Sequence, residues 1–393
     1  MNTLQRLHIP ALAGHALALA ALLAVAPAKA TTPLADQPVF TNTAVPGNLA
    51  LAISVEFPTV INAAYQGNFS AGTRYLGYFD PAKCYRYYQG NATHDAGPSA
   101  GNDVSHFFPV GSATSDFKCT GATLTDTWSG SFLNWLTMQS IDSFRWALTG
   151  GYRRVDTTTA TILERAWSSN QGGEGNFRIV GDAGRNSPSA TDIADHTPLA
   201  WASIRVSVRT RGNQILFTRT GTLNSGTPAT GTATHYTQGG TVAEGTVYRV
   251  FARVKVCDDS ASAGPLEGNC TAYPSGTYKP TGLIQQYSDR FRYSAFGYLT
   301  DGADNTANLQ RDGGVLRAQQ KFVGPLNYTP GSTPTSNSAR EWDPETGIFE
   351  PNPNPSDATA TNTLLGLSGA DAIVQSGVMN YLNRFGQTFQ GDH

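Results

Sequence analysis

The chain has 393 residues and a formal net charge of −2 at pH 7, and 14% of its residues are charged. This balance supplies neither a basic field for nucleic acid nor an acidic tail, so no nucleic-acid partner is expected. The length suits two domains or one domain with large insertions.

The first thirty residues have the pattern of a secretory signal peptide. Arg6 supplies a positive charge, 11–25 is an apolar run rich in Ala and Leu, and Ala28-Lys29-Ala30 forms a small-residue cleavage site. The run is shorter than the roughly 20 apolar residues that span a bilayer. We therefore expect a signal peptide at 1–30, an extended lead-in at 31–48, and an exported mature chain without a transmembrane segment.

The segment 49–174 is expected to mix helices and strands. Residues 49–55 form a short apolar run with β-branched residues, which predicts a buried strand, and a helix is expected to begin near Thr59. The clearest helical pattern spans 131–148, where apolar side chains recur at helical spacing before a Gly-Gly stop. We interpret this amphipathic helix as core packing without chemistry.

The segment 175–320 is predicted to be a β-rich insertion. Residues 205–220 alternate between polar and apolar side chains on both sides of an Arg-Gly-Asn turn, which predicts a β-hairpin. Residues 241–256 also alternate and predict one long strand. The segment 321–393 is rich in Pro and Asn at first, and an amphipathic helix is expected at 371–385.

All four cysteines lie in the exported part of the chain, at Cys84, Cys119, Cys257 and Cys270. An even count in an oxidising compartment favours disulfides, and three pairings are possible. The simplest pairing is local, joining Cys84 to Cys119 and Cys257 to Cys270. A zinc site is the rival interpretation, but there is no Cys-x-x-Cys spacing and no histidine at ligand spacing beside these cysteines.

Eight short motifs follow one another along the chain. They are SVEFPT (54–59), YFDPAKCY (78–85), GSFLNW (130–135), DTTTATILERA (156–166), VKVCDDS (254–260), NCTAYPSGTYKPTGLIQ (269–285), GGVLR (313–317) and EWDPETGIFEPNP (341–353). In this order they resemble the N-terminal region of the PilC/PilY family, exported proteins of type IV pilus tips and pilus biogenesis. Each motif alone is weakly specific, but eight in sequence are strongly so.

The resemblance implies a mixed α+β fold, an incomplete von Willebrand A-like N-terminal region with large β-rich and irregular insertions. Family members usually carry a long C-terminal propeller, but no blade-like repeat stands out here, so we expect a truncated member. The metal-binding Asp-x-Ser-x-Ser loop of the von Willebrand A fold is replaced by EFPT after the first strand. Only Glu56 and Thr59 remain as ligands there, and no metal is expected.

Residues 300–314 offer a candidate calcium site, because carboxylate and amide oxygens suit this ion. Their spacing is not that of an EF-hand, and Asp and Asn also favour turns. A turn without a cofactor is therefore the preferred interpretation. The candidate ligands are Asp301, Asp304, Asn305, Asn308 and Asp312.

A tyrosine-rich segment is a candidate binding surface, because tyrosine is favoured at interfaces. Tyrosines on strands are also ordinary core or cross-strand residues, and this second interpretation is the more common one. The residues are Tyr75, Tyr78, Tyr85, Tyr87 and Tyr88, with Phe79 among them.

The sequence gives little support for an enzyme. Residues 97–101, GPSAG, match the G-x-S-x-G nucleophile elbow, but that elbow requires a strand before it and a helix after it. Here the surroundings have loop composition, and neither His106 nor His196 stands in a partnered Cys or Ser pattern. A secreted hydrolase with an unrecognised site remains the alternative, and a remnant that does not fold alone is a third possibility.

The resemblance implies a non-enzymatic exported protein of the type IV pilus system, acting in pilus biogenesis and in adhesion to surfaces or hosts. Its expected partners are minor pilins or other pilus components, and a host or abiotic surface. Its expected location is the periplasm, the outer-membrane surface or the pilus tip.

Overall fold

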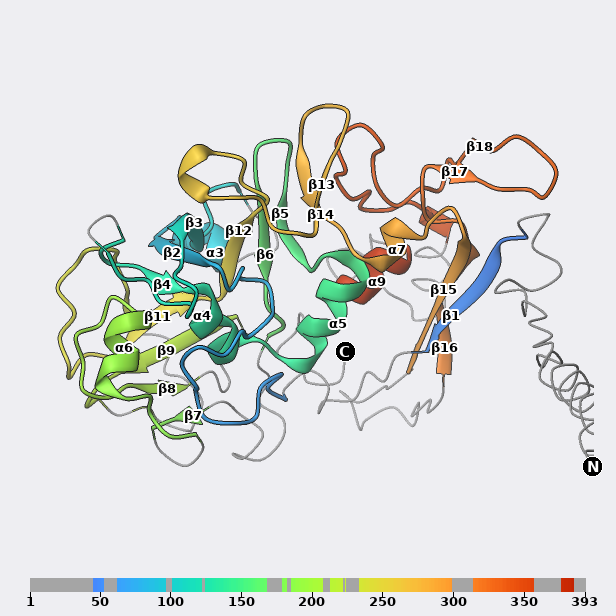
Figure 1. The fold of residues 1–393 in the computed structure, drawn as a ribbon. Helices are drawn as coiled ribbons and strands as arrows, with labels where there is room; N and C mark the ends of the chain where they lie inside the picture. The colour runs from blue at the N-terminus through green and yellow to red at the C-terminus, as the bar shows by residue number, and fades with distance from the viewer. Residues whose placement is uncertain are drawn as a thin grey trace, which may run out of the picture. The chain divides into compact units, whose positions relative to one another are not determined.

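The structure is a computed structural model that describes residues 45–52, 62–96, 101–121, 124–167, 179–181, 185–207, 213–221, 223, 233–298, 314–356 and 376–384. The predicted signal peptide and most of the predicted lead-in lie outside these residues. Within them the fold is mixed α/β with several sheets, as the sequence predicts at the level of fold class (Figure 1).

The largest sheet has six strands in the order β4-β2-β3-β12-β6-β5. Its neighbours pair antiparallel, except β3 and β12, which run parallel through Val254 and Phe107. The sheet therefore combines strands from both sides of the predicted boundary at 174/175. Its strands are β2 (Lys83–Tyr88), β3 (His106–Ser112), β4 (Trp128–Ser129), β5 (Arg153–Asp156), β6 (Thr161–Glu164) and β12 (Arg253–Val256).

A second sheet has five strands in the order β10-β11-β9-β8-β7. Strands β8 and β9 pair antiparallel, which confirms the pairing predicted for 205–220, although 208–212 lie outside the described residues. The strands are β7 (Ile179–Val180), β8 (Arg205–Ser207), β9 (Gln214–Thr218), β10 (Thr234–His235) and β11 (Tyr248–Phe251).

The single long strand predicted at 241–256 is wrong. The chain leaves the five-stranded sheet after β11 and enters the six-stranded sheet as β12. Ala252 stands between them, where its N–H donates to the carbonyl of Asn213 and its own carbonyl accepts from the N–H of Arg165. Alternation continues through this switch, so the sequence pattern alone does not reveal it.

The single helix predicted at 131–148 is also wrong, because it is divided into α4 (Gly130–Thr137) and α5 (Ser140–Thr149). The division falls where residues 62–64 cross the chain: the N–H of Ala64 donates to the carbonyl of Met138 at 3.0 Å, and the N–H of Ser140 donates to the carbonyl of Asn62 at 2.8 Å. These long-range bonds replace helical ones. Gly150, left-handed at φ 84°, then ends α5 as predicted.

The third sheet has three strands, β1 (Gly47–Ala52), β15 (Phe291–Tyr298) and β16 (Gly314–Lys321), in that order. Strand β1 runs parallel to β15, and β16 runs antiparallel to it. The strand predicted at 49–55 is thus present as β1, but it is not buried: Leu49 is 40% exposed. The reason is that β1 forms an edge of the described sheet.

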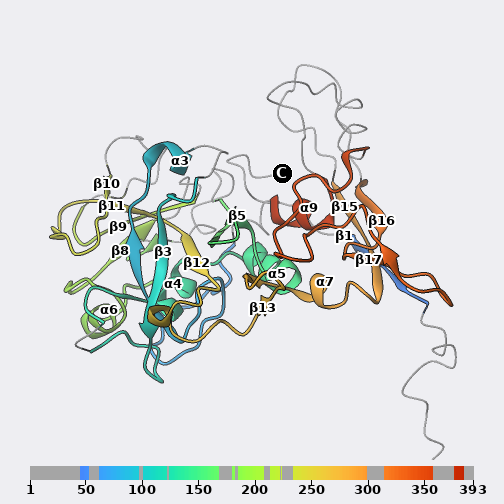
Figure 2. The same cartoon turned by 90° about the horizontal axis from the view of Figure 1, so that it is seen from above.

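Two large hydrophobic cores and one small cluster, formed by Val104, Val155 and Ile162, are present among the described residues. The main core spans residues from Tyr75 to Cys257, so it too crosses the predicted boundary at 174/175. The second core packs the inner face of the three-stranded sheet against α7 (Leu283–Gln286) and α9 (Val378–Arg384). Figure 2 shows α5, α7 and α9 together between the six-stranded and three-stranded sheets. The predicted terminal helix is described only from 376 onward, where α9 confirms it.

The remaining elements are short. They are the hairpin of β13 (Cys270–Ala272) and β14 (Tyr278–Pro280), the hairpin of β17 (Leu326–Asn327) and β18 (Thr335–Ser336), α3 (Ala92–Ala96), α6 (Ala190–His196) and the 3-10 turn η2 (Ala261–Ala263).

Candidate functional site

Both disulfides of the local pairing are formed. Cys84 joins Cys119 with a Cα–Cα distance of 5.7 Å, and Cys257 joins Cys270 at 5.6 Å. Glu267 lies beside the second disulfide, close enough for the three side chains to resemble a metal-ligand group. Sulfurs bonded to each other are not thiolate ligands, however, so this structure gives no support for zinc.

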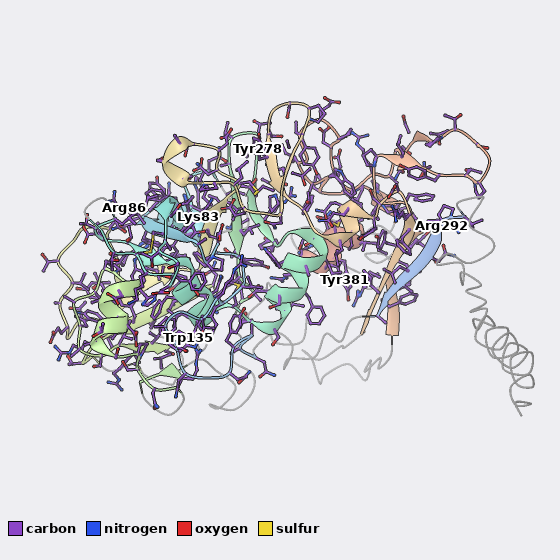
Figure 3. All side chains as sticks on the ribbon, viewed as in Figure 1. Lys83, Arg86, Trp135, Tyr278, Arg292 and Tyr381 are labelled. Carbon is purple, nitrogen blue, oxygen red and sulfur yellow. A yellow bond between two sulfur atoms is a disulfide. The ribbon has the colours of Figure 1, made fainter. Side chains whose placement is uncertain are left out.

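Glu267 connects the second disulfide to the six-stranded sheet. Its carboxylate accepts from the N–H of Cys257 at 2.9 Å and pairs with the ammonium of Lys83, at 2.9 Å, on β2. Lys83, labelled in Figure 3, is only 1% exposed. The lysine of the YFDPAKCY motif therefore neutralises a buried carboxylate, which explains why a charged residue stands beside the buried Cys84 and Tyr85.

A second buried charge cluster joins β6, β12 and α3. The Arg253 guanidinium contacts the carboxylates of both Glu164 and Asp95, and all three side chains are at most 3% exposed. Burial alone would raise the pKa of Glu164, but the charges of Arg253 and Arg154 and the hydrogen bonds from Trp167 and Arg253 outweigh it, so its pKa is lowered. Both buried carboxylates therefore have a counter-charge.

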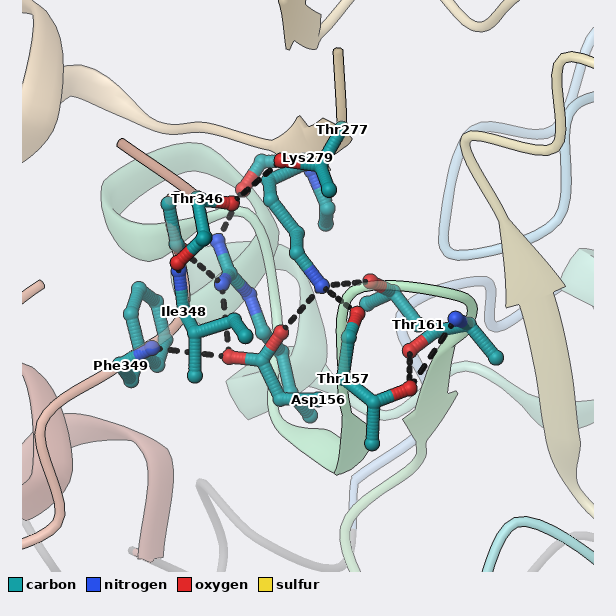
Figure 4. Close-up of polar contacts among 12 residues, drawn as sticks. Asp156, Thr157, Thr161, Thr277, Lys279, Thr346, Ile348 and Phe349 are labelled. Carbon is teal, nitrogen blue, oxygen red and sulfur yellow. Dashed lines mark hydrogen bonds and ion pairs between the residues drawn. The ribbon is translucent and has the colours of Figure 1, made fainter. Parts of the chain in front are cut away.

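A third polar cluster joins the β5–β6 hairpin to the β13–β14 hairpin (Figure 4). The Lys279 ammonium donates to the carboxylate of Asp156 at 2.7 Å and to the Thr161 hydroxyl at 2.9 Å. Asp156 also pairs with Arg153 at 2.9 Å and accepts from the N–H of Phe349 at 2.9 Å. Burial lowers the pKa of Lys279, and the charge and hydrogen bond of Asp156 partly oppose this effect.

A polar hollow of about 270 Å³ opens beside this third cluster. Its walls are the turn 157–161, the end of β12 with the following residues 255–259, and the hairpin residues 276–279. Hydroxyl groups, two aspartates and two lysines line it, together with the half-buried ring of Tyr278. We call it the threonine hollow.

A second hollow, of about 260 Å³, has mostly apolar walls. Leu76, Trp146, Leu163 and Val256 contribute side chains to it, and Arg74 lies at its edge. Neither hollow brings a serine, a histidine and a carboxylate together among the described residues.

The predicted tyrosine surface requires a correction. Tyr75, Tyr78, Tyr85 and Tyr87 are at most 7% exposed and belong to the main core, whereas Tyr88 is 42% exposed. The segment packs its rings inward because Phe79 and Phe107 offer aromatic partners, often edge to face. Core packing is the interpretation that the burial supports.

The two candidate histidines are structural. His106 is buried with Nδ1 2.7 Å from the carbonyl oxygen of Val104, and burial lowers its pKa to about 4. His196 lies against Phe69 and Phe132 with Nδ1 2.7 Å from the carbonyl oxygen of Asp192, and burial lowers its pKa as well. Both rings are therefore neutral near pH 7.

Other candidate residues lie outside the described part of the chain. The calcium candidates Asp301, Asp304, Asn305, Asn308 and Asp312, the metal-loop residues Glu56 and Thr59, and Ser99 of the G-x-S-x-G match all fall there.

The GSFLNW motif at 130–135 contributes contacts to the main core. Asn134 of GSFLNW donates to the carbonyls of Tyr75 and Phe79 and accepts from the N–H of Phe79. A Cβ at Gly130 would lie 2.0 Å from the carbonyl oxygen of Asp80, so only glycine fits. The sequence analysis did not predict these roles. The signal that could have indicated them is the presence of an Asn and of charged residues at otherwise apolar strand and helix positions.

The geometry thus defines a mixed α/β protein, held by two disulfides, in which the buried charges of the described residues support the fold. No helix in the described ranges is long and apolar enough to cross a membrane.

Comparison with known proteins assigns the family. Residues 66–214 match the family model "PilY1 homolog, small alpha/beta domain". Two curated proteins of Xylella fastidiosa (strain Temecula1 / ATCC 700964), each named "Type IV pilus biogenesis factor PilY1 homolog", are 42% identical over 353 residues and 28% identical over 310 residues. The chain belongs to the PilY family.

The alignments cover 88% and 70% of this chain but only 26% and 17% of the relatives, so the chain spans about a quarter or less of their length. No solved structure matches the chain significantly.

Proposed function

We propose that this chain is an exported, non-enzymatic component of the type IV pilus system that acts in pilus biogenesis and in adhesion. The observation that carries the proposal is the 42% identity, over 88% of the chain, to a protein named as a type IV pilus biogenesis factor. Its partners are minor pilins or other pilus components on one side, and a host or abiotic surface on the other.

The cysteines support export. All four are paired in two disulfides, and such bonds persist in the periplasm and at the cell surface but are rare in a reducing cytosol. Residues 1–30, which have the pattern of a signal peptide, also support export. The location we propose is the periplasm, the outer-membrane surface or the pilus tip.

The buried charges support a non-enzymatic role. Catalytic groups need access to a substrate and a nucleophile or base within hydrogen-bond reach. Among the described residues, Arg253 and Lys83 form ion pairs with buried carboxylates, and His106 and His196 face backbone carbonyls. A binding and assembly role requires no more than a rigid surface.

For the fold we propose that the three-stranded sheet is half of a von Willebrand A-like sheet. Its order β16-β15-β1 combines a parallel pair with an antiparallel edge strand, an arrangement found in many doubly wound folds. Residues 62–290 then stand between two neighbouring strands as one large insertion. Among the described residues β1 has a free edge, and further strands of such a sheet would add there.

The function is tested by export and recovery. We expect a strain that makes its own type IV pili to process the chain after Ala30, giving a mature protein that starts at Thr31 by N-terminal sequencing. Cross-linking in the intact cell should recover the mature chain with minor pilins. The control carries Ala28→Asp and Ala30→Asp, which block cleavage and should abolish recovery. Processed chain that never cross-links to a pilus component would overturn the assembly role.

The sheet is tested by cross-linking across its parallel pair. Ala50 lies opposite Ser294 in the register of β1 and β15, so cysteines at these two positions should form a disulfide on oxidation. Cysteines at Ala50 and Ala295 point to opposite faces and should not. Equal cross-linking by both pairs would contradict the parallel register, on which the von Willebrand A-like assignment depends.

A further inference from the structure

We propose that the threonine hollow is a binding site for one neutral sugar ring, the terminal hexose of a surface glycan. The inference deepens the adhesion role and in that respect rests on the proposed function. It is carried by the charge balance of the hollow, by its unengaged polar groups and by the way its walls are held in place.

Both ammonium groups at the hollow already have a carboxylate partner. Lys255 pairs with Asp258 at 2.8 Å, and Lys279 pairs with Asp156 at 2.7 Å. An anionic ligand would have to compete with these carboxylates for the ammonium groups. A metal cation would meet the two ammonium groups at short range. The balance therefore favours an uncharged ligand.

Polar groups remain available for such a ligand. Asp259 is exposed, and among the described residues its carboxylate takes part in no ion pair or side-chain hydrogen bond. Thr158 is exposed in the opposite wall, on the turn between β5 and β6. A carboxylate accepts from sugar hydroxyls, and a threonine hydroxyl both donates and accepts, so the two walls match a ring that carries several hydroxyl groups.

Tyr278 is also among the residues that line the hollow. Tyr278 is half-buried, and its ring packs against the main core, so it is fixed in orientation. A flat apolar ring beside polar groups suits a sugar, whose C–H faces are apolar while its edge is polar. The volume of about 270 Å³ lies just below the range of roughly 300 to 1,000 Å³ that is typical of drug-sized sites, which limits the ligand to one small ring.

The walls are preorganised. The Cys257–Cys270 disulfide joins the wall at 255–259 to the strand that opens the β13–β14 hairpin. Lys279 joins that hairpin to the turn 157–161 through Thr161 Oγ1 and the carbonyl of Thr157. All three walls are thus cross-connected, which lowers the entropy cost of binding.

The test is a titration of the purified mature chain with methyl β-galactoside, methyl α-mannoside, methyl α-glucoside and N-acetylglucosamine, followed by ligand-observed NMR. We expect saturable binding of at least one sugar with a Kd on the order of 1 mM. Asp259→Ala should weaken it about tenfold, because hydrogen bonds to charged groups are the stronger ones. Thr158→Val should weaken it about threefold.

Asp289→Ala is the matched control, since Asp289 is an exposed aspartate that does not line the hollow, and it should leave the Kd unchanged. Thermal melts of all variants verify folding. Absence of binding by every sugar, binding that Asp259→Ala and Thr158→Val leave intact, or calcium binding that depends on Asp259 in place of sugar binding would each overturn the inference.

Two further experiments follow. The first identifies the source of the sugar, and the second distinguishes failure of the sugar site from failure of the proposed function. Arrays of complex N-glycans and of microbial polysaccharides distinguish a host glycan from a microbial one, and binding to either supports the site. Loss of sugar binding leaves cross-linking to minor pilins unaffected, whereas failure of that cross-linking leaves the sugar titration unaffected, so the two failures are distinguishable.

Discussion

The main body around the six-stranded sheet and the region of the three-stranded sheet differ in their buried charges, disulfides and exposed apolar side chains. In the main body, buried charges lie in pairs that join distant segments of the chain, and both disulfides lie there. In the three-stranded sheet, β1 has a free edge among the described residues, and Leu49, Phe296 and Leu316 are 37% to 47% exposed. The first region is held by buried ion pairs and both disulfides, and the second presents apolar side chains and a strand edge.

The carboxylates show the same difference. Glu164 in the main body contacts Arg253 and has a lowered pKa. Glu341, beside the second core, accepts from the N–H groups of Val378 and Met379 at the start of α9 and faces Lys321 at 3.2 Å, yet burial outweighs these contacts and raises its pKa. The charge of Glu164 is thus compensated more fully than that of Glu341.

The largest effect is expected from breaking the charge cluster of the main body. Arg253→Met leaves Glu164 and Asp95 buried without their cation, and removing one partner of a buried pair costs about 3 to 5 kcal/mol. We expect this loss in the free energy of unfolding, measured by denaturant titration. The control is Arg219→Met, because Arg219 pairs with Glu244 at the surface with side chains 30% and 48% exposed, where a pair contributes about 1 kcal/mol or less. Equal losses for the two variants would refute the distinction.

The disulfides come next. The Cys84–Cys119 bridge closes 35 residues and the Cys257–Cys270 bridge closes 13. The chain-entropy relation gives about 4 kcal/mol for the longer loop and about 3 kcal/mol for the shorter. Replacing each pair by serines should therefore lower the denaturant midpoint more for Cys84/Cys119. The reverse order would mean that contacts around Glu267, rather than loop closure, govern the second bridge.

The periodicity of apolar side chains predicted which helices and strands are present better than it predicted where they begin and end. The pattern at 131–148 is helical throughout, but the break at Met138 and Gln139 is imposed by residues 62–64, about 75 positions earlier in the chain. Likewise, Ala252 changes sheets because Asn213 and Arg165 receive its backbone groups. Such long-range hydrogen bonds have no local signature.

The candidate site was predictable only in part. The cysteine pairing followed from spacing and compartment, and the structure contains it. The tyrosines carried the same sequence signal whether they lay at a surface or in a core, and only the packing around Phe79 and Phe107 decides for the core. The threonine hollow arises where three distant segments meet, so no single stretch of sequence predicts it.

A pH series should give opposite signs for the two glutamates. The raised pKa of Glu341 means that the folded state holds its proton more tightly, so its contribution to stability is present below the ordinary value of 4.5 and is lost as the pH rises above it. The lowered pKa of Glu164 gives a contribution that is present above 4.5 and is lost as the pH falls below it.

The measurement is the unfolding free energy of the natural chain minus that of Glu341→Gln and of Glu164→Gln, taken between about pH 3 and pH 7. With rising pH the first difference should fall and the second should rise. Slopes of the same sign would contradict the assignment of the two environments.

The smallest effect is expected on the open face of the three-stranded sheet. Leu316 is 47% exposed, so Leu316→Ala should cost about 1 kcal/mol or less. Leu163 on β6 is 1% exposed, and the same substitution there should cost about 2 to 5 kcal/mol because it leaves a cavity in the main core. Because the substitution is the same in both variants, their thermal melts compare the two regions directly. A loss at Leu316 as large as that at Leu163 would mean that the exposed face is covered in solution, and the contrast between the two sheets would then fail.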